Sequence, residues 1–227
     1  MITFVFLLAA AIATLFWAHM FLRRDRFESE PRSLLVKLFF AGAGVTAIAF
    51  VVNTAALLIL PQQAVLILVA PTAEELLKIG AVLLVAYRSR HFTQVVDGSI
   101  YCISCAFGFS VVEDLLYGAN YGSGAILLRT VLLPLGHPLF TGVAGHYIGR
   151  AKFENRNELI ALGVVVAILL HMGWNGTLGL PGLVPNSLAL LLLLLLLPVY
   201  IFFLVRFLRR MSGAEAQAIR RLVLGPS

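Results

Sequence analysis

The sequence predicts an all-α fold, a polytopic bundle of about seven transmembrane helices that forms a single membrane domain over residues 1–227. Hydrophobic residues make up 60% of the chain and charged residues only 12%, about half the charged share of a soluble domain. The hydrophobic residues also come in long blocks with few charges, the length that a helix needs to cross a bilayer. This composition excludes a disordered chain, and a count of two cysteines excludes a disulfide scaffold.

Seven spans can be placed along the chain, and they leave no loop long enough to hold a soluble domain. They are residues 2–22, 35–60, 64–87, 96–118, 125–149, 158–178 and 186–208. The first span has no basic segment before it and is followed by several arginines from Arg23 onward. We therefore expect it to stay in the membrane as an anchor and not to be removed as a signal peptide.

The lysines and arginines predict the orientation of the spans. Fifteen of the 17 basic residues fall in segments 23–37, 88–95 and 150–157 and in the tail from 206 onward. The alternate connections, 61–63, 119–124 and 179–185, hold none. The positive-inside rule then places the N-terminus outside and the C-terminus in the cytoplasm. This asymmetry and the anionic lipids of the cytoplasmic leaflet account for the net charge of +6, and nothing in it indicates nucleic acid.

Ionisable side chains lie inside these apolar spans, where they are costly. A charge at the middle of a membrane helix costs about 2.5–3.5 kcal/mol on the insertion scale, so these groups should face one another inside the bundle. They are Glu74, Glu75, Lys78, Glu113, Asp114, Arg129, His137, His146 and His171. Ionisable groups within a membrane are by default a hypothesis for a functional site.

The third span carries the segment Glu74-Glu75-Leu-Leu-Lys78. Glu74 and Lys78 are four residues apart on one helical face, with the acid before the base as a favourable pair requires. A buried ion pair that fixes helix packing would explain one glutamate and leave the other without a partner on its own helix. The second carboxylate would then be available as a general base.

Later spans supply the remaining candidates. Glu113 in the fourth span shares a face with Phe109, and His171 in the sixth shares a face with Asn175, because each pair is four residues apart. The fifth span contains an isolated His137. By a rise of about 1.5 Å per residue, these groups all lie in the middle or the outer half of their spans.

His146 in the fifth span is a weaker candidate. It lies nine residues after His137, about 180° round a straight helix, so the two imidazoles should not point into one cavity. We expect His146 to be a packing or interfacial residue.

Taken together, these segments resemble the PrsW family of intramembrane proteases, relatives of the CAAX prenyl proteases. The resemblance rests on Glu74-Glu75-Leu-Leu-Lys78 (EExxK), Phe109-Ser-Val-Val-Glu113 (FxxxE), His137, His171-Met-Gly-Trp-Asn175 (HxxxN) and the Asp97-Gly98 pair. It covers about residues 70–180. The second motif ends in His in CAAX proteases and in Glu113 here, which is the PrsW pattern and argues against lipidated CAAX substrates.

The resemblance implies an intramembrane endopeptidase in the cell membrane of a bacterium or archaeon. Its expected partners are the lipid bilayer and a membrane-anchored protein, such as an anti-sigma factor, cut in or near its transmembrane segment. The catalytic core would cover about residues 64–178. Residues 1–60 and 186–208 would then be scaffold spans and residues 211–227 a cytoplasmic tail.

Two mechanisms stay open at this point. In a metal-free reaction, Glu74 or Glu75 activates water, Glu113 assists, and His171 with Asn175 stabilises the oxyanion.

In a metal-dependent reaction, Glu113, His137 and His171 would hold Zn²⁺ and leave one position open. Lys78 is expected to form a structural ion pair in both cases. A transporter, a channel or a non-catalytic scaffold with a polar core is the alternative function. A transporter would predict internal repeats and broken helices, and the sequence has no repeat.

Overall fold

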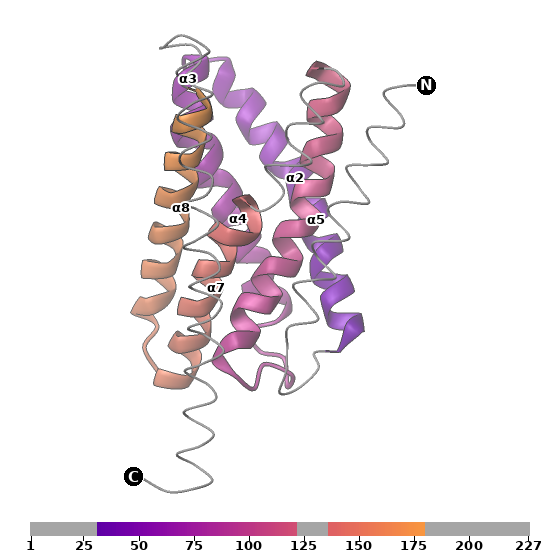
Figure 1. The fold of residues 1–227 in the computed structure, drawn as a ribbon, viewed down its shortest axis with the longest axis vertical. Coiled ribbons are helices and arrows are strands. Elements are labelled where there is room, and N and C mark those ends of the chain that lie inside the picture. The colour runs from indigo at the N-terminus through magenta and orange to yellow at the C-terminus, as the bar shows by residue number, and fades with distance from the viewer. Residues whose placement is uncertain (1–30, 122–135, 180–227) are drawn as a thin grey trace, which may run out of the picture. The chain divides into compact units, whose positions relative to one another are not determined.

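A computed structural model describes residues 31–121 and 136–179 of the 227-residue chain. Every element in this part is a helix, which confirms the all-α prediction (Figure 1). The elements are α2 (Arg32–Leu57), α3 (Gln62–Ala64), the π-helix η1 (Val65–Val69), α4 (Ala70–Val85), α5 (Val95–Tyr121), α7 (Gly136–Glu154) and α8 (Glu158–Gly179). The chain divides into two compact units, Met1–Gly176 and Thr177–Ser227, and the contacts below belong to the first.

Four of the expected spans, 35–60, 64–87, 96–118 and 158–178, coincide with described helical segments. The fifth, 125–149, is helical from Gly136 onward. Three described helices are long and apolar enough to cross a membrane, and they cover Arg32–Leu57, Val95–Leu116 and Glu158–Gly176. Several predicted features lie outside the described residues. They are the spans 2–22 and 186–208, Arg129, the tail, and the connection 179–185 apart from its first residue.

Prolines and one carboxylate mark the helix boundaries around α4. Pro61 ends the turn after α2 and precedes α3, where its missing N–H costs nothing. Pro71 lies in the first turn of α4, which continues directly from η1. At the start of α5, Asp97 accepts the backbone N–H groups of Thr93 and Gln94 at 2.7 Å each, which satisfies donors that the helix cannot.

The turn between α4 and α5 and the end of α7 lie together. Lys152 donates to the carbonyl oxygen of Tyr87 at 2.8 Å, and its Nζ lies 4.3 Å from the centre of the Phe92 ring. Asn155, which links α7 to α8, has φ 53°, a left-handed conformation that asparagine tolerates better than most residues. The basic segments 88–95 and 150–157 therefore share one end of the bundle.

The α5 helix is the most buried of the described helices, and every residue from Asp97 to Ser110 is buried. It packs against both α2 and α7 at very short backbone distances. A Cβ on Gly145 of α7 would overlap the carbonyl oxygen of Gly98 in α5. Small residues at helix contacts allow the close approach that membrane helices use for association.

Large apolar side chains point away from this core. Phe40 and Val51 on α2 are 67% and 65% exposed, Leu84 on α4 is 89% exposed and Leu169 on α8 is 60% exposed. The charged groups of α4 are buried instead, so the middle of the described helices has the surface of a protein that faces lipid.

Candidate active site

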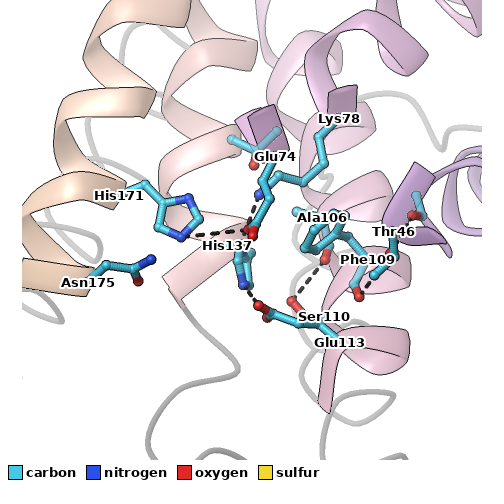
Figure 2. A network of polar contacts seen from close by, with 12 residues as sticks. Thr46, Glu74, Lys78, Ala106, Phe109, Ser110, Glu113, His137, His171 and Asn175 are labelled. Atoms are coloured by element: carbon cyan, nitrogen blue, oxygen red, sulfur yellow. Dashed lines mark hydrogen bonds and ion pairs between the residues drawn. The ribbon is translucent and has the colours of Figure 1, made fainter. Parts of the chain in front are cut away.

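The charged residues of α4 are buried at the centre of the described helices. Glu74 is 4% exposed, and Glu75 and Lys78 are not exposed at all. They follow directly on η1, a single π-helical stretch of a kind often found at functional sites. Figure 2 shows Glu74 and Lys78 from α4 facing His137 and His171, which come from α7 and α8.

Lys78 joins two of the predicted site residues. Its Nζ lies 2.5 Å from Glu75 Oε1 and 2.9 Å from His137 Nδ1, and it is 4.6 Å from the centre of the Phe109 ring. The spacing on α4 favours an ion pair between Lys78 and Glu74, four residues away on the same helical face. In the structure Lys78 forms its ion pair with Glu75, three residues away. Because an ammonium group can only donate, Nδ1 of His137 accepts and its Nε2 carries the proton.

Glu75 accepts hydrogen bonds on both carboxylate oxygens. Its Oε1 receives Lys78 and also His171 Nδ1, which lies 3.0 Å away. Its Oε2 receives the hydroxyl of Thr141 at 2.8 Å. With three donors, Glu75 is held in one orientation and has little capacity left for a water molecule.

Glu74 is in the opposite situation. Its Oε1 accepts the amide of Asn53 at 3.3 Å, whereas its Oε2 is buried and accepts no hydrogen bond from the described residues. That oxygen lies 3.9 Å from His171 Nε2. Because His171 donates through Nδ1 to Glu75, the neutral imidazole presents a lone pair at Nε2. Two acceptors thus face each other, an arrangement suited to a water molecule or a cation between them.

Glu113 contacts the second imidazole. Its Oε2 lies 2.8 Å from His137 Nε2, so the N–H of His137 donates to Glu113 while Lys78 donates to the other ring nitrogen. The Glu113 side chain is 14% exposed, more than those of Glu74 and Glu75. Glu113 is thus the carboxylate of the site that is most open to its surroundings.

Asn175 lies one helical turn beyond His171 (Figure 2). Its Nδ2 donates to the carbonyl oxygen of Leu66 in η1 at 2.9 Å. A carboxamide nitrogen has two N–H bonds, so this contact leaves one of them for another acceptor. The His171 ring stacks on Phe140 with ring centres 5.0 Å apart, which fixes the plane of the imidazole.

A metal ion is compatible with part of this cluster. Glu74, His137 and His171 each offer one ligand atom, and these atoms lie within 4.8 Å of one another. At His137 a metal would have to replace either the ammonium group of Lys78 or the proton that binds Glu113. One carboxylate and two imidazoles make a common zinc donor set, and the contact of His171 Nδ1 with Glu75 is the usual support of a metal-binding histidine. The orphaned oxygen of Glu74 also fits a cation. This group shares both histidines with the sequence-based set but contains Glu74 where that set has Glu113.

The sequence profile of one protein family, described as PrsW family intramembrane metalloprotease, matches residues 30–205. This match covers most of the chain, including all the residues of the cluster. The chain belongs to the PrsW family of intramembrane metalloproteases. It is therefore a membrane protease.

Individual PrsW proteins agree with this assignment. The chain is 30% identical to Protease PrsW of Shouchella clausii (strain KSM-K16) over 174 residues, which cover 74% of this chain and 80% of the relative. It is 28% identical to Protease PrsW of Clostridioides difficile (strain 630), over 69% of this chain and 71% of the relative. Protease PrsW of Bacillus subtilis (strain 168) is 27% identical, over 66% and 72%. No solved structure matches the chain.

The PrsW motifs did not predict every residue at the site. Thr141 lies in the fifth span outside the motifs, and Asn53 comes from a span that carries no motif. A lone hydroxyl or amide in an apolar span has no spacing to single it out, although a buried polar group in a membrane is itself a signal. Asp114, to which the spacing gave no role, is also buried.

Proposed function

We propose that the chain is a multi-pass endopeptidase of the cell membrane that hydrolyses a peptide bond in or near the transmembrane segment of a membrane-anchored protein. An anti-sigma factor is the substrate class that the family resemblance suggests. The observation that carries the proposal is the pair of buried acceptors, Glu74 Oε2 and His171 Nε2, 3.9 Å apart. A water molecule can donate one hydrogen to each of them and turn its own lone pair toward a carbonyl carbon.

Glu74 is the proposed general base. Its Oε2 accepts a proton from water as the oxygen attacks the scissile carbonyl, and the carboxyl group returns this proton to the amine when the C–N bond breaks. Glu75 has a different proposed role, because its two oxygens are already occupied by Lys78, His171 and Thr141. It holds His171 in the tautomer and orientation that the reaction needs.

The remaining residues deal with the charges that develop during the reaction. The second N–H of Asn175 would stabilise the oxyanion of the tetrahedral intermediate, while His171 Nε2 would accept a hydrogen bond from the hydroxyl that the attacking water leaves on it. Glu113, at the more open edge of the cluster, would assist proton transfer through its contact with His137. Lys78 keeps the buried carboxylates from repelling one another.

Zn²⁺ is the proposed metal. It would be held by His137, His171 and one carboxylate. That carboxylate would be Glu74, whose ligand atom lies close to those of the two histidines, or Glu113, as the sequence predicts. When bound, the ion would supply Lewis-acid activation of the carbonyl and of water.

The proposed topology has seven spans with the N-terminus outside. The contact of Lys152 with Tyr87 and Phe92 supports it, because it brings two of the basic segments to one end of the bundle. Counted along α4, α5, α7 and α8 from that end, the site residues lie roughly 16–27 Å away at the rise of a helix. This distance favours a site in the outer half of the membrane, with substrate entering from the extracytoplasmic side.

The test is reconstitution of the purified full chain with single-span membrane proteins of known sequence, followed by mass spectrometry of the products. We expect at least one substrate to be cut at a single position, with no product from the Glu74→Gln protein. Equal product from both proteins would contradict the proposed role of Glu74. Absence of any cleavage across a broad substrate set would contradict the proposed substrate class.

A further inference from the structure

The buried face of α2 ends in an amide that points toward the catalytic cluster. This face consists of Leu34, Leu38, Gly42, Thr46 and Ala49, which recur every three or four residues. Asn53 follows Ala49 by four residues and so continues the same row. The earlier residues of this row are apolar or small, with the exception of Thr46. The Thr46 hydroxyl donates to the backbone carbonyl oxygens of Gly42 and Phe109. Asn53 instead reaches a side chain of another helix.

That side chain is Glu74. Asn53 Nδ2 lies 3.3 Å from Glu74 Oε1, and this is the one hydrogen bond that Glu74 receives from the described residues. The orientation of the amide follows from its partner, because the reverse orientation would set an amide oxygen against a carboxylate oxygen. The Asn53 oxygen is itself buried and has no hydrogen bond within the described part of the chain, so Glu74 is the group that orients this amide.

We infer that Asn53 is a positioning residue for Glu74, an inference that rests on the proposed function. The terminal torsion of a glutamate is broad, and a carboxylate held by a single contact would otherwise rotate among several orientations. The N–H of Asn53 holds Oε1 on the α2 side and thereby turns Oε2 toward His171. Glu75 needs no such help, since three donors from α4, α7 and α8 hold it. The span assigned to the scaffold therefore contributes to the site.

The test uses three substitutions in the full-length protein, purified in detergent. Asn53→Asp keeps the shape of the side chain and removes the donor, and Asn53→Leu removes all polarity at similar volume. Thr46→Val is the matched control, because it removes another buried hydrogen-bond donor from the same row of α2 without touching Glu74. A single-span membrane protein with a fluorophore and a quencher on opposite sides of its transmembrane segment serves as the substrate for kcat and KM.

We expect both Asn53 variants to lose kcat by roughly 10- to 100-fold, the range for a hydrogen bond to a charged group, with KM unchanged. Asn53→Asp should be the more severe of the two, because it sets a second carboxylate against Glu74; a purely steric role would predict the reverse. Thr46→Val should keep the kcat of the wild type. Wild-type kcat in Asn53→Leu, or an equal loss in Thr46→Val, would overturn the inference.

A spectroscopic measurement separates this inference from the proposed function. The infrared band of the Glu74 carboxyl group is the band that disappears in the Glu74→Gln difference spectrum. It should shift in Asn53→Leu and stay in place in Thr46→Val. A band that does not move in Asn53→Leu would overturn the positioning role whether or not the protein cuts the single-span substrate. If the band shifts in Asn53→Leu as expected but the wild-type protein cuts no substrate, the result counts against the proposed function alone.

Discussion

His171 and Glu75 lie 96 residues apart in the chain, and their side chains meet with Nδ1 3.0 Å from Oε1. This contact determines the chemistry of the other ring nitrogen. Because a carboxylate can only accept, the proton of the neutral imidazole sits on Nδ1 and Nε2 is left as a lone pair. The lone pair faces Glu74 Oε2, and the two adjacent glutamates of α4 thereby acquire different roles.

The first prediction concerns these roles. Glu74→Gln, Glu75→Gln and His171→Ala should each lower the rate of proteolysis by roughly 10²–10⁴-fold, the usual contribution of a positioned acid or base, while the protein remains inserted and folded. His146→Ala is the matched control, since His146 contacts Tyr147 and lies outside the cluster. Product formation by each purified variant is the measurement. An inactive but stable His146→Ala protein would mean that the wrong histidine of α7 has been assigned.

The second prediction concerns Thr141, whose hydroxyl donates to Glu75 Oε2. Thr141→Val removes this donor with little change in volume, and we expect kcat to fall roughly tenfold, equivalent to about 1.4 kcal/mol. Ser110→Ala removes a buried hydroxyl that, within the described residues, donates to the carbonyl oxygen of Ala106 in its own helix, and it should leave kcat unchanged. An unchanged kcat in Thr141→Val would show that Glu75 is held sufficiently by its other two donors.

The third prediction concerns the metal. A strong chelator should abolish activity and added Zn²⁺ should restore it. The zinc content of purified variants then identifies the carboxylate ligand: Glu74→Gln loses zinc if Glu74 belongs to the site, and Glu113→Gln loses it if Glu113 does. His137→Ala should lose zinc in either case. Full activity after verified metal removal would leave the water-activating glutamate as the sole mechanism.

The fourth prediction concerns the contact between α5 and α7. A side chain on Gly145 would overlap the backbone of Gly98, so Gly145→Val should lower the stability by about 1–3 kcal/mol or more. Gly44→Ala is the control, because a Cβ there meets nothing within 4 Å. That substitution should leave the stability unchanged or raise it by up to ~1 kcal/mol, since alanine is the better helix former. Thermal unfolding in detergent measures both, and equal stability of the two variants would contradict the packing argument.

The fifth prediction concerns the side from which the substrate is cut. The basic segments lie at the end of the bundle away from the cluster, so the cut should fall just outside the membrane or in the outer part of the substrate's transmembrane segment. Mass spectrometry of the two products locates it. A cut in the cytoplasmic half of the substrate would contradict the proposed orientation or the proposed depth of the site.

Much of this protein could be predicted from features that are local in the sequence. Block length and composition predicted helices where α2, α4, α5, α7 and α8 lie, because a helix in a bilayer must be long, apolar and internally hydrogen-bonded. The spacing of EExxK and HxxxN placed Glu74 with Lys78, and His171 with Asn175, on one face of their helices. The cost of charge in a membrane predicted that Glu74, Glu75, Glu113, His137 and His171 would converge.

Contacts between helices were decided by the tertiary structure alone. Spacing on α4 favoured Glu74 as the partner of Lys78, yet Lys78 contacts Glu75 and also His137, which is 59 residues away on α7. The same holds for Asn53, which meets Glu74 only because α2 packs beside α4. Helical periodicity gives the face on which a residue lies, but the rotation of one helix against another and the rotamer of each side chain depend on how the whole bundle packs.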